Sequence, residues 1–415
     1  MIDFDQFSLA NGLHVIVHPD PAVPIATVNL LYNVGSRDED ENKTGFAHLF
    51  EHLMFGGSKN IPNYDEPLQL VGGENNAFTN PDITNYFITL PATNLETAFW
   101  LESDRMLSLS FDPKVLEVQR KVVIEEYKQN YLNQPYGDAM ITLKALAYQT
   151  HPYRWPTIGR DISHIEQATL NDVKSFFYKF YRPNNAILVV AGQVNTEEVK
   201  GLAEKWFGDI PAGETYRREL LQEDQQTAPR FMKKTDDVPV HAIYKAFHIP
   251  GRNQPGYHAA DLLSDILGRS RSSRLFTRLV KENPLFSSIN AYVTGAIDPG
   301  LLIVSGRLNE GVSLETADKA ISTVIDEMQE KSVGGEELRK VKNQAESTLV
   351  FSEMELLNRA MSLAYSALLG DPNLINQESE KIQAVTADDI QQTAQKILSA
   401  NNSSTLFYEA DVNDS

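Results

Sequence analysis

The chain repeats its own pattern at a spacing of about half its length. The stretch "DPAVPIATVNLLYNVG" (20–35) resembles "DDVPVHAIYKAFHIPG" (236–251), and their Val-Pro pairs, which begin at 23 and 238, align at an offset of 215. Further on, "NDVKSFFYKFYRPNNAILVVAG" (171–192) has the outline of "DDIQQTAQKILSANNSSTLFYEA" (388–410) at an offset of 217. Two separate matches at nearly one offset indicate two domains of the same fold.

The expected domains are residues 1–212 and 228–415, joined by a linker at 213–227. The region around this linker, "PAGETYRRELLQEDQQTAPR", is polar and has proline near both ends, as is typical of a domain boundary. A chain of 415 residues also exceeds the size at which a single hydrophobic core usually stops growing.

Strand and helix signals occur in both halves. Short segments rich in β-branched residues predict strands in the first half at 13–18, 25–34 and 186–192. Apolar residues at helical spacing predict helices at 46–55, 95–107, 113–132 and 170–181. Strands, then helices, then strands again favour an α+β fold of two homologous domains, each a mainly antiparallel sheet with helices packed on one face.

Composition excludes several classes of protein. A formal net charge of −19 argues against nucleic-acid binding, and no apolar stretch is long enough for a membrane span. The first twenty residues lack a signal-peptide pattern, so we expect a cytoplasmic location; a trimmed chain would read the same, which keeps a periplasmic location open. Because the chain has no cysteine, nitrogen and oxygen atoms must hold any zinc ion.

The stretch "HLFEH" (48–52) is the strongest candidate for chemistry. On a helix, His48 and His52 lie on one face and can direct two ring nitrogens at a single ion, while Glu51 flanks that face. The order H-x-x-E-H is the inverted zinc-peptidase motif. Because an ordinary helix can carry this pattern by chance, a third ligand is required. The predicted helix at 113–132 offers Glu125 and Glu126.

Nearly the whole chain resembles the pitrilysin–insulinase family of inverted-motif zinc metallopeptidases. It is most similar to the small two-domain bacterial type, which resembles the beta subunit of the mitochondrial processing peptidase. The segments that carry the resemblance are "LANGLHVIV", "VGSRDEDENKTGFAHLFEHLMFGGS", "ENNAFTNPDITNYFITLP", "QRKVVIEEYKQNYLNQPYG" and "SSRLFTRLV". The resemblance implies a zinc-dependent endopeptidase that hydrolyses peptides or unfolded polypeptides in an enclosed chamber.

The resemblance also implies roles for individual residues. His48, His52 and Glu126 would hold one Zn²⁺ per chain, and Glu51 would be the catalytic base. Glu126 matches the last glutamate of a family segment like "ERDVIIRE", in which this chain has Gln119 where a second acidic residue is frequent. Two alternatives for the third ligand are Glu125 and, at the longer spacing of some relatives, position 129, which is a glutamine.

Substrate binding is implied for Asn76, Ala77 and Phe78. These residues match a family edge strand to which an extended peptide adds as a further strand. Such binding through the backbone would accept many sequences, so we expect selection by length and unfoldedness more than by one side chain.

The second half departs from the family pattern. At the offset of 215, the positions of His48, Glu51 and His52 fall on apolar residues, which are Leu263, Ile266 and Leu267. Val280 and Ser287 stand where the family usually has an arginine and a tyrosine that bind the substrate carbonyl. The chain is therefore expected to be the zinc-bearing subunit of a heterodimer with a zinc-less homologous subunit, or else a homodimer.

Two functions of other classes compete with this interpretation. One is a non-catalytic scaffold like the processing-peptidase-like subunits of respiratory complexes, which usually lose residues of the zinc motif. The other is a peptide-binding subunit with structural zinc, but structural sites usually have four ligands. The remaining histidines are scattered and are expected to be structural or surface residues; they are His14, His18, His151, His164, His241, His248 and His258.

Overall fold

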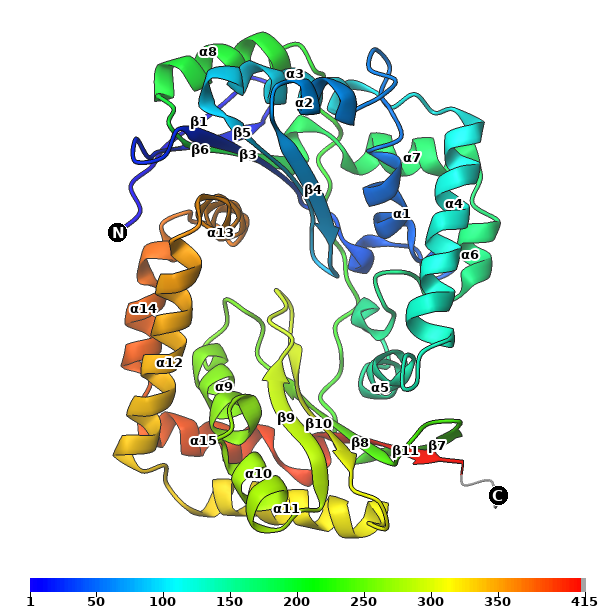
Figure 1. Ribbon diagram of the computed structural model, residues 1–415, viewed down its shortest axis with the longest axis vertical. Helices are drawn as coiled ribbons and strands as arrows, with labels where there is room; N and C mark the ends of the chain where they lie inside the picture. The colour runs from blue at the N-terminus through cyan, green and yellow to red at the C-terminus, as the bar shows by residue number, and fades with distance from the viewer. Residues whose placement is uncertain (412–415) are drawn as a thin grey trace. The chain divides into compact units, whose positions relative to one another are not determined.

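Two β-sheets organise the structure, a computed structural model that describes residues 1–411. Each sheet is the centre of a separate unit of the chain (Figure 1). The first unit contains residues 1–127, 155–220 and 350–377, and the second contains the rest of the described chain. The α+β class with two similar domains is thus confirmed. The continuous boundaries 1–212 and 228–415 stay a prediction about the repeated sequence.

The first sheet has six strands in the order β1-β2-β6-β3-β5-β4. Its strands are β1 (Asp5–Ser8), β2 (His14–Pro19), β3 (Ile25–Tyr32), β4 (Glu74–Thr79), β5 (Thr84–Pro91) and β6 (Ala186–Gly192). Neighbouring strands are antiparallel except β2 and β6, which are parallel. The sheet is therefore mainly antiparallel, and β4 forms one of its edges.

The second sheet has five strands in the order β7-β11-β8-β10-β9. Its strands are β7 (Arg230–Asp236), β8 (Ala242–Ile249), β9 (Phe286–Val293), β10 (Gly300–Leu308) and β11 (Ser403–Ala410). Here the parallel pair is β7 and β11, and the other neighbours are antiparallel. The strands β3 and β8 begin at Ile25 and Ala242, which reproduces the offset of 217 found at the end of each half.

The helices divide between the two units. Those of the first unit are α1 (Phe46–Leu53), α2 (Asp65–Leu70), α3 (Leu95–Leu107), α4 (Pro113–Tyr127), α6 (Ile162–Glu166), α7 (Leu170–Phe180), α8 (Thr196–Phe207) and α13 (Leu356–Leu368). Those of the second are α5 (Ala139–Ala147), α9 (Tyr257–Ser264), α10 (Arg274–Phe276), α11 (Leu314–Glu330) and α15 (Ala387–Ile397). Two helices have residues in both units, α12 (Gly335–Glu353) and α14 (Leu374–Ala384).

The repeat extends to the hydrogen bonds that begin equivalent helices. Thr169 and Asp172 form a capping box at the start of α7, in which each side chain accepts the other's backbone N–H. Thr386 and Asp389 form the same box at the start of α15, again at an offset of 217. Both boxes satisfy backbone N–H groups that have no partner within the helix. The two equivalent helices therefore begin with the same capping interaction.

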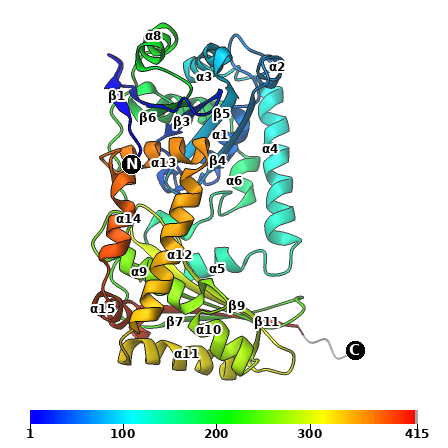
Figure 2. The same ribbon diagram turned by 60° about the vertical axis from the view of Figure 1, so that its left-hand side comes forward.

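Each unit includes a helix that belongs by sequence to the other half. Helix α13 packs on the first sheet through Leu356, Ala360 and Leu363, on the side away from α3 and α8 (Figures 1 and 2). Helix α5 packs on the second sheet through Ala139, Leu143 and Ala147. The apolar residues of both helices recur every three or four positions, so each helix presents one stripe to its sheet.

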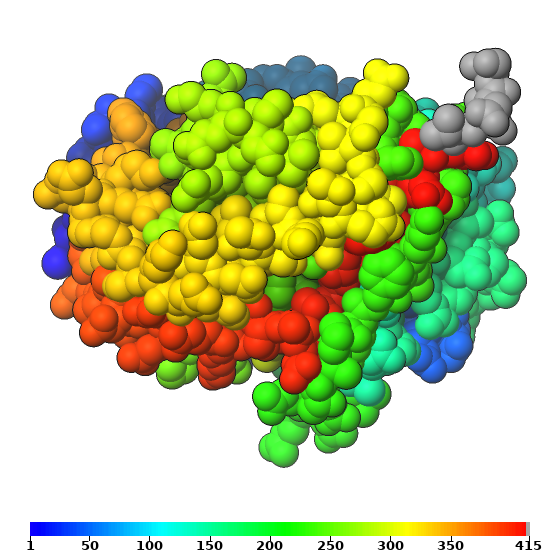
Figure 3. All heavy atoms as spheres, turned by 90° about the horizontal axis from the view of Figure 1, so that it is seen from below, coloured from blue at the N-terminus to red at the C-terminus, as the bar shows by residue number. Residues whose placement is uncertain are grey.

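The opposite face of the second sheet carries the main core of that unit. Helices α9, α11 and α15 contribute buried residues to this core, and α11 lies beside α15 on the outer surface (Figure 3). At its edge, Glu378 accepts hydrogen bonds from Arg252 at 2.5 Å and from His258 at 3.1 Å. Burial alone would raise the pKa of the Glu378 carboxyl, but these two partners outweigh it and bring that pKa to about 2.

A buried ion pair stabilises the first unit. The Arg105 guanidinium donates to both carboxylate oxygens of Glu102, at 2.5 and 2.8 Å, and both side chains are almost fully buried. The same guanidinium lies over the rings of Tyr64 and Tyr86, at 4.6 and 4.3 Å from their centroids. A buried charge is tolerated when it is paired and hydrogen-bonded in this way.

In residues 1–411, no helix combines the length and the apolar composition that a membrane crossing requires.

Candidate metal centre

Helix α1 presents the three polar residues of the motif on one side. It begins after Gly45, whose φ of 90° is left-handed and suits glycine. The residues that it buries are Phe46, Ala47, Leu49, Phe50 and Leu53. His48, Glu51 and His52 are only partly buried, because they lie on the side that faces helix α4 and strand β4.

His48 and His52 converge on a single carboxylate oxygen of Glu126. The distance from Nε2 to Oε2 of Glu126 is 3.6 Å for His48 and 3.4 Å for His52. Zinc–ligand bonds of about 2 Å in a tetrahedron separate ligand atoms by roughly 3.3 Å, so these spacings suit a zinc ion. Within residues 1–411, these three side chains form the only such group of histidine and acidic residues close enough to share a metal ion.

The protonation of the three groups also suits a metal. Burial lowers the pKa of His48 to about 4, which keeps its ring neutral and its nitrogen lone pair free. The hydrogen bond with His52 lowers the pKa of the Glu126 carboxyl, which keeps this group ionised. Because metal ligands must be neutral imidazoles and ionised carboxylates, the residues fit zinc with a fourth position left open.

Glu51 occupies the same helix face without joining the group of three. Its side chain is partly buried, and this burial raises the pKa of its carboxyl. A carboxylate beside the metal ligands but outside the ligand set can act as a general base. Two histidines and one carboxylate that can hold a metal ion, with a separate carboxylate beside them, form an arrangement that can support hydrolysis.

The alternatives for the third ligand lie elsewhere on the same segment. Glu125 is exposed, and it does not belong to the group that the two histidines form with Glu126. Gln129 lies in the single π-helical turn that follows α4, Lys128–Leu132, and is also exposed. Gln119 is half-buried two turns before Glu126. The geometry thus favours Glu126 over both alternatives.

The predicted substrate-binding residues lie on the edge strand β4. Asn76 and Phe78 have exposed side chains on one face of this strand, and Phe78 is 37% exposed. Ala77, on the other face, donates its backbone N–H to the Asn76 side chain at 2.8 Å. Because β4 packs beside α1, the edge lies next to the candidate metal centre in the same unit.

The expected counterparts of the motif in the second half require a correction. Helix α9 begins after Gly256, whose φ of 89° matches that of Gly45 at the start of α1. Aligning these two glycines gives a local offset of 211. The offset of 215 therefore paired the residues of α1 with second-half residues that lie one helical turn too far along the chain. The reason is a shorter loop before α9.

With this correction, the residues opposite His48, Glu51 and His52 are Ala259, Leu262 and Leu263, instead of Leu263, Ile266 and Leu267. All of these second-half residues are buried in the core of the second unit. The conclusion that this half has no metal motif is unchanged.

Val280 and Ser287 lie on different elements of the second unit. Val280 is in the π-helical segment Thr277–Glu282 and packs partly buried against the core. Ser287 is exposed on β9, where its hydroxyl donates to the Arg307 carbonyl at 3.2 Å. Neither side chain can supply the cation or the phenol expected at these positions.

The structure adds Glu39, Asp38 and Arg218 to the residues around the site. Glu39 contacts the start of α1, and Arg218 contacts Asp38 from the segment after α8. Sequence reasoning missed these residues, because nothing in a run of acidic residues such as "RDEDEN" shows which member is buried. The only signal was the loop length, which differs between the two halves of the repeat.

Comparisons with known proteins find similar sequences and structures. Residues 14–160 match the model of the insulinase family, peptidase family M16, and residues 167–345 match the model of the M16 inactive domain. The chain is 31% identical to the zinc protease PqqE of Helicobacter pylori over 81% of this chain and 77% of that protein. It is 29% identical to a probable mitochondrial-processing peptidase subunit beta of Schizosaccharomyces pombe, over 71% of this chain and 67% of that one. The crystal structure of a protease from Helicobacter pylori superposes with a TM-score of 0.93 and 28% identity, covering 99% of this chain and all of the other.

Proposed function

Because the chain belongs to the insulinase family of peptidases, family M16, we propose that it is a zinc-dependent endopeptidase acting on peptides or unfolded polypeptides. The observation that carries the proposal is the convergence of His48, His52 and Glu126, with Glu51 beside them. The proposal assigns one Zn²⁺ to each chain, with the first three residues as its ligands.

The chain's own residues account for the other parts of peptide hydrolysis. A zinc ion, when bound, supplies a Lewis acid that polarises a carbonyl and makes water more acidic. Glu51 takes the proton of the attacking water and gives it to the departing amine. The edge of β4 holds the substrate as an added strand, with Asn76, Ala77 and Phe78 beside the peptide. Main-chain pairing of this kind places the scissile bond near the metal for many sequences.

A second subunit is part of the proposal. With Val280 and Ser287 in place of an arginine and a tyrosine, the chain lacks two groups that would stabilise charge on the substrate carbonyl. Loss of one such donor typically lowers the rate by about 100-fold or more. We therefore favour a heterodimer, in which a zinc-less homologous subunit supplies these groups and closes a chamber, over a homodimer. A cytoplasmic location stays a prediction.

One observation supports a non-catalytic alternative. Residues 167–345 match a model described as an inactive domain, and this range includes Val280 and Ser287. A peptide-binding subunit or a scaffold would have this feature as well. This alternative does not account for Glu51, because a base outside the ligand set adds nothing to peptide binding.

The test couples metal content to cleavage. The purified chain should contain about one zinc per chain, and it should cut an unstructured peptide in a way that a chelator abolishes and added zinc restores. Glu51→Gln should keep zinc and lose hydrolysis, because the amide cannot accept the proton. Glu125→Gln, an exposed change on α4, is the matched control and should keep both. Metal-free wild-type chain, or turnover by metal-replete Glu51→Gln, would refute the proposal.

The partner is tested separately. Weak cleavage by the chain alone, raised by adding a homologous two-domain protein that carries the arginine and tyrosine, supports the heterodimer. Full activity of the chain alone contradicts it and leaves the homodimer.

A further inference from the structure

The loop before helix α1 is longer than the corresponding loop before helix α9 in the second half. Both loops begin with a glycine whose backbone N–H is held by the side chain three residues later. Gly35 donates to Asp38 at 3.0 Å, and Gly251 donates to Gln254 at 2.9 Å. The helix then starts after Gly45 in the first half, but after Gly256 in the second. The half that carries the metal motif therefore has an additional segment between this turn and its helix.

The additional segment carries a buried carboxylate that holds the start of α1. Glu39 accepts the backbone N–H of Gly45 at 2.9 Å and that of Ala47 at 2.8 Å, one with each carboxylate oxygen. Both N–H groups lie at the end of the helix that leaves its donors unsatisfied. Gly45, at the N-cap position, has no side chain to satisfy them. Glu39 supplies this cap from outside the helix, and His48 follows Ala47 directly.

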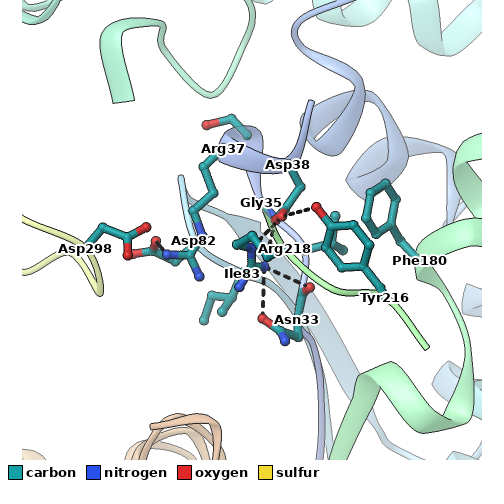
Figure 4. Close-up of polar contacts among 12 residues, drawn as sticks. Asn33, Gly35, Arg37, Asp38, Asp82, Ile83, Phe180, Tyr216, Arg218 and Asp298 are labelled. Atoms are coloured by element: carbon teal, nitrogen blue, oxygen red, sulfur yellow. Dashed lines mark hydrogen bonds and ion pairs between the residues drawn. The ribbon is translucent and has the colours of Figure 1, made fainter. Parts of the chain in front are cut away.

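The residue before Glu39 is held by the segment that follows α8. The fully buried carboxylate of Asp38 accepts bonds from Tyr216 Oη at 3.0 Å and from two nitrogens of Arg218 at 2.6 and 2.9 Å, besides that from Gly35. Arg218 also donates to the carbonyl and side-chain oxygens of Asn33, at 3.2 and 3.0 Å (Figure 4). Charge-assisted bonds in this number fix the turn firmly.

Two further contacts hold the same turn, the 3₁₀ segment Ser36–Asp38. Arg37 pairs with Asp82 at 2.8 Å, and both side chains are buried. The Trp155 ring nitrogen donates to the Ser36 carbonyl at 2.9 Å. Because each residue of the turn has such a contact, the backbone just before Glu39 is restrained. The position of the Glu39 carboxylate is therefore restrained as well.

From these contacts we infer that Glu39, supported by the Arg218–Asp38 ion pair, is a positioning residue for the candidate metal centre. It fixes the first turn of α1 and so sets where His48 and His52 stand relative to Glu126. The inference rests on the proposed function. The second half provides the internal comparison, since it has the same turn and the same helix but neither the additional carboxylate nor the metal motif.

The decisive measurement is metal binding by the full-length chain, with Co²⁺ as a spectroscopic substitute for Zn²⁺. Affinity is measured by competition with a chelator, and the visible absorption of bound Co²⁺ reports the ligand geometry. Glu39→Ala removes both acceptors and should weaken metal binding about 10- to 100-fold, the range typical of groups that orient metal ligands. It should also change the Co²⁺ absorption. Glu39→Gln keeps one acceptor oxygen and should lie between Glu39→Ala and the wild type.

Two arginine variants separate this role from general stability. Arg218→Met should shift metal affinity in the same direction as Glu39→Ala, by a smaller factor. Arg359→Met is the matched control, because Arg359 forms a similarly buried ion pair with Asp20 at 2.5 Å in the same unit, away from α1. It should lower the melting temperature without changing metal affinity or absorption.

The outcomes separate the inference from the proposed function. If Glu39→Ala does not fold, Glu39→Gln decides. Folded variants of Glu39 that bind Co²⁺ with wild-type affinity and an unchanged spectrum overturn the inference alone. A wild-type chain that binds neither metal refutes the proposed function, and the inference with it.

Discussion

Helix α13 gives the sharpest test of how the first unit is built. Its Leu363 side chain has no exposed surface and packs with residues of β2, β3 and β6, including Ile16, Leu31 and Val189. In the sequence this leucine lies far beyond the last of these strands, which ends at Gly192. If α13 belongs to the first unit, Leu363→Ala must destabilise that unit, although the substitution lies in the second half of the chain.

The expected size follows from the burial. Removing a fully buried leucine side chain to alanine costs about 3 kcal/mol, within a range of about 2–5 kcal/mol that depends on how well the cavity closes. The first unit has roughly 220 residues, so its unfolding entropy is about 0.5 kcal/mol per degree. The melting temperature of this unit should therefore fall by about 6 °C.

Differential scanning calorimetry on the full-length chain measures this change, with urea unfolding as a second measure. Ser362→Ala, an exposed change on the same helix, is the control and should shift stability by less than about 0.5 kcal/mol. Below the transition, metal affinity should stay at the wild-type value, because α13 and α1 lie on opposite faces of the sheet. A loss below about 1 kcal/mol for Leu363→Ala would refute the packing of α13 on this sheet.

Three further predictions concern single side chains. Glu126→Gln should weaken zinc binding by more than about 100-fold in a chelator competition, whereas Glu125→Gln should not change it. Arg105→Met should cost about 3–5 kcal/mol in urea unfolding, because it leaves Glu102 buried and unpaired; a loss under about 1 kcal/mol contradicts this. Because its pKa falls from 4.5 to about 2 on folding, Glu378 stabilises the protein above pH 4.5, and this contribution of about 3 kcal/mol is lost as the pH falls towards 2. Glu378→Gln should remove that part of the acid dependence in unfolding measured across this pH range, and an unchanged profile contradicts the assignment.

Local sequence patterns predicted several elements of the first unit. The expected helices at 95–107 and 170–181 are α3 and α7 within one residue, and the expected strand at 186–192 is β6. Apolar periodicity and cap residues are sufficient for such elements, because tertiary contacts agree with local preference. The expected helix at 113–132 is also continuous, but its last five residues are π-helical, a change in hydrogen bonding that periodicity cannot show.

The exchange of α5 and α13 between the halves could not be predicted from the sequence. Both helices carry an apolar stripe, and such a stripe shows that a helix packs on a sheet without showing which sheet. Because the fold is repeated, the chain has two similar sheets, and an apolar stripe alone does not show on which of them a helix packs. Chain connectivity decides it here, through α4 and α12, which lead directly into the exchanged helices.

The candidate ligands were predictable for a different reason. His48 and His52 are linked by helix geometry alone, so a spacing of four was enough to place them together. Glu126 needed the family resemblance, because it lies on a different helix, far from His52 in the sequence, and no local rule fixes that distance. Glu39 is close in sequence to α1, yet its role depends on burial and on the direction of its side chain, which a composition of mixed acidic residues does not encode.

The two halves show what the candidate site costs the fold. Helix α9, with Ala259, Leu262 and Leu263 at the three motif positions, is buried on the side where α1 stays partly exposed. Those apolar residues add to the core of the second unit. In α1 the same positions hold two imidazoles and a carboxylate that are partly buried, and burying polar groups costs free energy that hydrogen bonds must offset. A helix under that constraint needs external support, and the additional loop with its buried carboxylate is found only before α1 in the described repeat. The candidate site and the loop proposed to hold it thus occur together in one copy of the fold, whereas the other copy has buried apolar residues at the corresponding positions.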